Sequence, residues 1–211
     1  MSHLSEPEME IFGLLLAAWP AAMRELSPRG ADGKIAELVA DAERKMEGRM
    51  AKASAEHKCA LRAGMWLLAD DLDRAHKICQ DIATPYGSAW HAVMHRREGD
   101  FSNALYWWRL ARDVRWDGAG ESDPPRARHG VADAVRGVLV KMRDGGVVVP
   151  TAVMWEKELE MRGYDPSRFV ELVEAAERES GAGGWRDVLV AVQRVEWMGL
   201  FMECVKEGGR H

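Results

Sequence analysis

Apolar residues recur along this chain at steps of three and four, and runs that alternate apolar with polar residues are nearly absent. Steps of three and four place side chains on one face of an α-helix, whereas a half-buried strand needs a step of two. The clearest case is the segment 185–205, which carries Val188, Val192, Val195, Met198 and Met202. We therefore predict an all-α protein whose last helix spans the core.

Capping residues, prolines and glycines divide the rest of the chain into further helices. The sequence predicts about seven to nine helices in one domain over residues 1–211. A glycine- and proline-containing stretch, 116–130, is expected to be a flexible loop. The expected helices are 5–26 with an early end at Pro20, 32–68 as one helix or two, 71–83, 85–98, 101–114, 131–143, 154–162, 165–179 and 185–205.

Two neighbouring helical pairs repeat each other in sequence. Their turns contain Asp71 and Asp100, which are 29 positions apart, and an alanine follows each aspartate four residues later. The second unit, from Gly99 to Ala111, resembles the second half of a tetratricopeptide repeat, in which small residues let paired helices approach closely. That family has a period of about 34 residues and an aromatic and glycine pattern that this chain lacks. The resemblance implies stacked antiparallel hairpins and says nothing about ligands.

Composition narrows the classes of partner. Acidic and basic residues are interspersed, 34 against 29, so the sequence shows no basic face for nucleic acid. Apolar runs stay shorter than the roughly 20 residues of a membrane span, and the N-terminal residues do not form a secretion signal. Cys59, Cys79 and Cys204 lie among apolar helical neighbours, as free thiols do in a reducing compartment. We expect a soluble cytoplasmic protein, and the oligomeric state stays open.

The helix expected over 85–98 carries most of the candidate chemistry. His91, His95 and Glu98 fall on one stripe of this helix, within about 60° of one another. Two imidazoles one turn apart are spaced to share a metal ion, and a nearby carboxylate either binds the ion or orients a histidine. His76, on the preceding helix, completes such a site if it faces the same space. One hypothesis is therefore a divalent-metal site; the other needs no cofactor.

The second hypothesis starts from the apolar residues that surround the same helix on nearly every side. A helix of this kind is buried, and its charged side chains then need partners. These side chains would form an internal network that holds the helical hairpins in register. Arg96 or Arg97 would form an ion pair with Glu98, Asp100 or Glu196. Glu196, on the last helix, is expected to point into the protein. The candidate members are Arg96, Arg97, Glu98, Asp100 and Glu196.

The segment WHAVMHRREGD at 90–100, together with Asn103, Tyr106 and Trp107 and the terminal pair Glu196 and Trp197, resembles a family of uncharacterised helical proteins from bacteria and fungi. The resemblance covers about half of the chain. It implies a shared fold and a shared polar cluster, and it implies no reaction.

Two functions remain open from the sequence. The first is a non-catalytic helical scaffold that binds a protein or peptide between its hairpins. The second is a metal-binding protein or enzyme that uses the histidine and glutamate cluster. A nucleophilic serine elbow and a phosphate-binding glycine loop are both absent from the sequence. Nine tryptophans favour a core built on indole rings over a ligand-stacking role. Binding of an aromatic or apolar small molecule among them is a third possibility, for which the sequence gives no specific support.

Overall fold

The computed structural model consists of helices and their connecting turns, without a strand among the residues that it describes. These are residues 13–208 apart from 16, 20, 29, 50–53, 115–128 and 180–182. The all-α prediction is confirmed. The helices are α2 Gly33–Arg49, α3 Ala55–Leu68, α4 Leu72–Cys79, α5 Pro85–Glu98, α6 Phe101–Leu110, α7 His129–Asp144, α8 Pro150–Arg162, α9 Pro166–Arg178 and α10 Gly183–Gly208.

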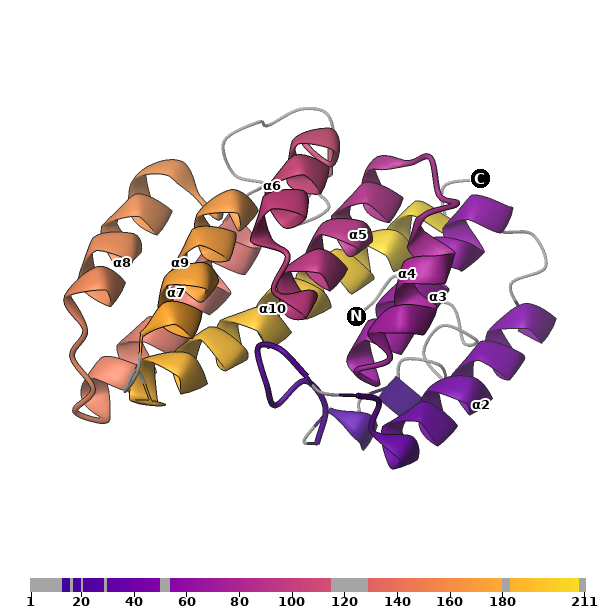
Figure 1. The fold of residues 1–211 in the computed structure, drawn as a ribbon, viewed down its shortest axis with the longest axis horizontal. Coiled ribbons are helices and arrows are strands. Elements are labelled where there is room, and N and C mark those ends of the chain that lie inside the picture. Colours follow the sequence, from indigo (N-terminus) through magenta and orange to yellow (C-terminus); the bar gives the residue numbers. More distant parts are fainter. Residues whose placement is uncertain are drawn as a thin grey trace.

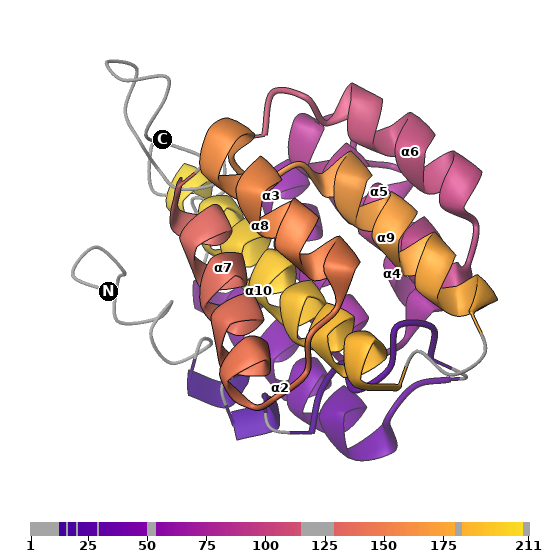
Figure 2. The same ribbon diagram turned by 90° about the vertical axis from the view of Figure 1, so that its left-hand side faces the viewer.

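The long helix α10 connects the two ends of the molecule. In Figure 1, α7, α8 and α9 lie at one end and α2, α3 and α4 at the other, with α5 and α6 between them. Helix α10 runs behind this row and contacts α3, α5, α7 and α9 (Figure 2). Its residues Leu189, Val192 and Leu200 are fully buried. The last helix therefore spans the core, as its pattern predicts.

The α3–α4 turn and the α5–α6 turn share one backbone geometry. Their N-cap residues, Asp71 and Asp100, have φ/ψ angles of −85°/77° and −89°/73°. The residue before each aspartate is left-handed, with φ of 61° at Asp70 and 82° at Gly99. The backbone N–H of each aspartate donates to the carbonyl five positions back, which closes the preceding helix. The 29-residue sequence repeat is thus also a repeat of turn structure, while the likeness to tetratricopeptide repeats stays a prediction.

Helix α5 approaches α3 closely because position 64 is glycine. A Cβ atom at Gly64 would lie 2.6 Å from Cζ2 of Trp90 on α5. The carbonyl of Gly64 also accepts a hydrogen bond of 2.7 Å from Nε1 of Trp197 on α10. The rings of Trp90 and Trp197 are 6.2 Å apart, and Trp197 stacks on Phe201 at 4.8 Å. Indole rings therefore hold α3, α5 and α10 together.

Several predicted boundaries are wrong by a few residues. Helix α7 begins at His129, so residues 129 and 130 belong to a helix and not to the predicted loop 116–130. The rest of that loop prediction, residues 116–128, lies outside the described residues. The predicted segment 32–68 is two helices, with Ser54 capping the second. Within the described residues, no helix combines the length and apolar character needed to cross a bilayer.

Candidate metal centre

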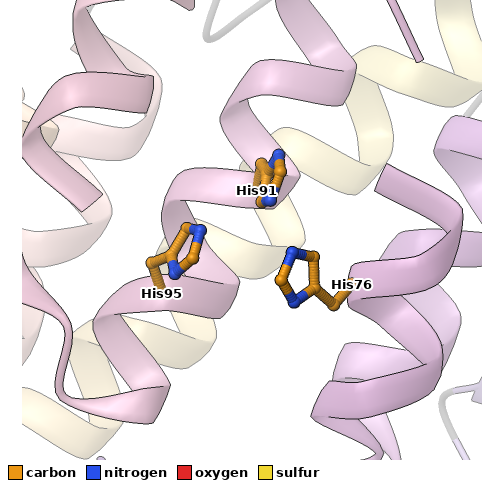
Figure 3. A group of neighbouring side chains, drawn as sticks. All are labelled: His76, His91 and His95. Carbon is orange, nitrogen blue, oxygen red and sulfur yellow. The ribbon is translucent and has the colours of Figure 1, made fainter. Parts of the chain in front are cut away.

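Three histidines meet between α4 and α5. His76 comes from α4, and His91 and His95 come from consecutive turns of α5 (Figure 3). One ring nitrogen from each residue lies within 4.8 Å of the other two. The figure shows the His76 ring on the opposite side of the shared space from the two rings of α5. The structure thus brings His91 and His95 together with His76, which the sequence names as a member only if it faces the same space.

Helix α5 holds its two histidines on a well-defined frame. Thr84 caps its N-terminus by accepting the N–H of Gly87 at 3.2 Å, and Pro85 occupies the first turn. Gly99 ends the helix in the left-handed conformation. Because both ends are fixed by local sequence, the i, i+4 spacing places His91 and His95 one above the other. Their rings stack with centroids 4.8 Å apart and planes 14° apart.

His91 is the most unusual member of the group. Its side chain stacks on Trp107 of α6 with ring centroids 4.0 Å apart, and only 4% of the residue is exposed. Neither Nδ1 nor Nε2 has a hydrogen-bond partner among the residues that the structure describes. Leaving a buried polar group without a partner costs about 1–3 kcal/mol. Aromatic stacking packs the ring but leaves that cost in place.

His95 lies beside two carboxylates. Its Nδ1 is 3.4 Å from Oε2 of Glu98 and 4.0 Å from Oδ2 of Asp100. A carboxylate on one nitrogen of an imidazole fixes the ring and leaves the other nitrogen to a ligand. Glu98 is therefore placed to orient His95, outside the three-histidine group itself. Asp100 keeps its other task of capping α6.

Burial keeps the two α5 imidazoles neutral. Burial in first place, together with the neighbouring His95 and His76, lowers the pKa of His91 from 6.5 to about 4. Burial also lowers the pKa of His95, although Glu98 opposes this shift. A neutral imidazole has the lone pair that a metal ion needs. At pH 7 both residues are therefore in the form that binds metal.

The spacing of the nitrogens leaves room for an ion. Metal–nitrogen bonds of about 2.0–2.1 Å in a tetrahedral site put the nitrogens about 3.3 Å apart. The 4.8 Å limit on the present separations is wider than this. The nitrogens would have to approach one another by at most about 1.5 Å, and His76 is half-buried, whereas His91 and His95 are buried.

The candidate arginines lie away from the histidines. Nη1 of Arg96 is 2.5 Å from Oε2 of Glu196 on α10, and both side chains are 0% exposed. The hydroxyl of Tyr164 donates to the other oxygen of Glu196 at 2.7 Å, and the Arg96 guanidinium lies 4.4 Å from the centre of the Phe169 ring. Burial raises the pKa of Glu196, while Arg96 opposes that shift. Arg96 and Glu196 form a pair that the network hypothesis names, and this pair joins α5 to α10.

Arg97 has a different partner from those expected. It donates to the carbonyl of Leu67 at 2.6 Å and to Oδ1 of Asp70 at 2.5 Å. Burial lowers the pKa of this guanidinium, whereas Asp70 opposes that shift. The pair ties the end of α5 to the α3–α4 turn. The predicted cluster is therefore three separate groups: the histidines with Glu98 and Asp100, the Arg96 pair, and the Arg97 pair.

Sequence reasoning missed three residues of these groups, namely Asp70, Tyr164 and Trp107. Asp70 directly precedes the repeated turn, where helix capping is enough to explain an aspartate. Tyr164 lies in a connection between helices, without a periodic pattern to mark it. Trp107 follows Tyr106 and precedes Trp108 in the sequence, and no pattern indicates which of these rings covers His91.

The chain matches no family model, no curated protein and no solved structure in the three comparisons made with it. The resemblance to uncharacterised helical proteins of bacteria and fungi stays a prediction. The functional argument therefore depends on the geometry of the site.

Proposed function

We propose that this protein binds a late first-row transition-metal ion, Zn²⁺ in first place, through His76, His91 and His95. Imidazole nitrogen suits Zn²⁺, Cu²⁺ and Ni²⁺, whereas Ca²⁺ and Mg²⁺ prefer oxygen ligands. The main support for this proposal is that His91 is buried and that neither of its ring nitrogens has a hydrogen-bond partner within the described part of the chain. A metal ion would give one of those nitrogens a strong partner.

A purely structural role explains the cluster less well. Histidine rings can stabilise a helical interface by stacking, and His91 does stack on Trp107 and His95. Phenylalanine or leucine would supply similar packing without buried polar atoms. Three imidazoles that converge on one space add polar atoms, which need a bound partner such as a metal ion or a water molecule.

Three protein ligands leave a fourth tetrahedral position for water or a substrate. This ligand count is typical of catalytic zinc sites, while structural sites are closed by four protein ligands. Glu98 would contribute by holding the His95 ring, and its carboxylate and that of Asp100 make the surroundings favourable to a cation. An enzymatic role for the bound ion stays a prediction.

The scaffold function that the sequence placed first also stays a prediction. The partnerless nitrogens favour metal binding over it, because protein or peptide binding gives no reason for converging imidazoles. The expectations of a cytoplasmic location and of no nucleic-acid partner likewise remain predictions from composition.

Metal titration tests the proposal. We expect chelator-treated protein to bind one equivalent of Zn²⁺ in calorimetry, and Co²⁺ to give the visible absorption bands of a nitrogen-ligated tetrahedral ion. His76→Gln and His91→Gln should each weaken binding at least about tenfold. His57→Gln, outside the cluster, is the matched control and should bind as the parent does.

Folding of each variant is checked by circular dichroism. If replacement of the buried His91 unfolds the protein, His76→Gln still tests metal binding, because His76 is only half-buried. The proposal is wrong if the parent protein takes up no stoichiometric metal. It is equally wrong if His76→Gln and His57→Gln have the same effect.

A further inference from the structure

A second polar site lies on the other side of α6. A pocket of about 690 Å³ opens where the C-terminal turns of α6 and α8 meet the N-terminal turn of α9. Helix α9 lies between α8 and α6 in both views (Figures 1 and 2), and it contacts α6 directly. The volume falls within the range of about 300–1,000 Å³ that small-molecule sites occupy.

The pocket is separate from the histidine cluster. Trp107 of α6 covers His91, whereas the next residue, Trp108, lines the pocket. Successive residues of a helix point about 100° apart, so the two tryptophans serve different sides of α6. Trp108, Trp155 and Tyr164 form the aromatic floor of the pocket, with 4%, 1% and 2% of each residue exposed.

The lining carries more positive than negative charge. The basic residues are Arg109, Arg112, Arg162 and Arg168, and the acidic residues are Glu158 and Asp165. This balance is opposite to that of the whole chain, which has a formal net charge of −5. Arg112 lies 3.9 Å from Asp113 and Arg168 pairs with Glu171, so the excess positive charge of the lining comes from Arg109 and Arg162.

Both acids of the pocket already have partners. Oε2 of Glu158 accepts a hydrogen bond of 3.0 Å from Arg168, and that arginine also donates to Glu171 at 2.9 Å. Asp165 caps α9 by accepting the N–H of Ser167 at 2.9 Å. These contacts leave the remaining arginines without a carboxylate from the pocket wall.

Two of those arginines come from different helices. Arg109 is in the last turn of α6 and Arg162 is in the last turn of α8. Neither makes an ion pair or side-chain hydrogen bond within the described part of the chain. A cation at a helix C-terminus offsets the negative end of the helix dipole, which explains each residue alone. It does not explain why both exposed guanidinium groups line one pocket, where they could contact the same anion.

We infer that this pocket binds a small organic anion, with its phosphate or carboxylate group held by Arg109 and Arg162. A guanidinium group binds a phosphate or a carboxylate through two parallel hydrogen bonds, so the same pair of arginines could hold either group. The aromatic floor fits an apolar body attached to that group. The inference is independent of metal binding, because no residue belongs to both sites.

Calorimetry with three probes at fixed ionic strength tests this inference: phenyl phosphate, benzoate and inorganic phosphate. Arg109→Gln and Arg162→Gln should each weaken the better organic probe by about tenfold or more, as expected for loss of a charge-assisted hydrogen-bonded pair. Arg44→Gln is the matched control because it removes the same charge from an exposed position on α2, where Arg44 pairs with Asp41. That control should bind within about twofold of the parent.

The results of these titrations distinguish a phosphate ligand, a carboxylate ligand and the absence of a site. Tighter binding of phenyl phosphate assigns a phosphate ligand, tighter binding of benzoate assigns a carboxylate ligand, and either result supports the site. Absence of saturable binding by both organic probes overturns the inference. An equal loss in Arg44→Gln also overturns it, because the protein would then attract anions only through its overall charge.

Discussion

Replacing Arg96 or Glu196 tests the buried network that positions α5. Their oxygen–nitrogen distance is 2.5 Å, and both side chains are 0% exposed. The surface pair of Arg178 and Glu174 on α9 has the same distance, but the Arg178 side chain is 74% exposed. The two pairs therefore differ in burial while the separation of the charges is held constant.

The expected cost follows from desolvation. Removing one partner of a buried ion pair costs about 3–5 kcal/mol, because the other charge stays buried without compensation. Arg178→Met should cost about 0.5 kcal/mol or less, since exposed pairs contribute little. Glu196→Gln should cost more than Arg96→Met. Glu196 can take up a proton when its partner is lost, whereas an arginine cannot become neutral.

Urea unfolding monitored by circular dichroism gives the free energies. Total stabilities of about 5–15 kcal/mol leave room to measure such losses in a folded protein. The double variant Arg96→Met with Glu196→Gln should lose clearly less than the sum of the single losses, because it leaves no unpaired charge. Additive losses, or a cost below about 1 kcal/mol for Arg96→Met, would refute the reasoning.

Three further predictions concern other sites. Gly64→Ala should lose about 1–3 kcal/mol in urea unfolding because its Cβ would meet an indole ring at 2.6 Å, whereas Gly137→Ala, with open space around it, should be neutral or stabilising. In metal-free protein the free energy of unfolding should fall as the pH drops from 6.5 towards about 4. Folded His91, with its lowered pKa, stays neutral while the unfolded chain takes up the proton, and His91→Phe should remove this part of the pH dependence. Burial raises the pKa of the Cys79 thiol, so mass spectrometry should find it unreactive towards iodoacetamide in the native state, while half-buried Cys59 reacts.

Local signals explain which helix boundaries the sequence predicts. The range of α5, Pro85–Glu98, is predicted to the residue because a threonine cap, a proline and a glycine mark its ends. Helix α6 ends at Leu110, earlier than the predicted 114, because no such signal follows it. Its last residues turn through the bonds from the N–H of Ala111 to Trp107 and from the N–H of Val114 to Ala111. Such a turn depends on tertiary packing, which a one-dimensional pattern does not contain.

For the candidate site, too, the sequence predicts contacts within one helix but not contacts between residues far apart in the chain. The spacing of His91 and His95 is a property of one helix, and the sequence contains it. The pairing of Arg97 with Asp70 spans 27 positions, and that of Tyr164 with Glu196 spans 32. Helical periodicity does not reach across such separations. Proximity in sequence instead favoured Glu98 and Asp100 as partners of the arginines, although both lie beside His95.

The two hypotheses drawn from the sequence, a buried network and a metal site, are compatible because α5 separates them on its surface. Arg96 and Arg97 are about 100° and 200° around the helix from His95. Each is neutralised by an acid from another element, Glu196 in one case and Asp70 in the other. A guanidinium beside the imidazoles would repel a metal cation, whereas the histidine side of α5 is adjacent to the carboxylates of Glu98 and Asp100. The buried ion pairs thus join α5 to α10 and to the α3–α4 turn, and they place both guanidinium groups away from the face on which the three histidines converge.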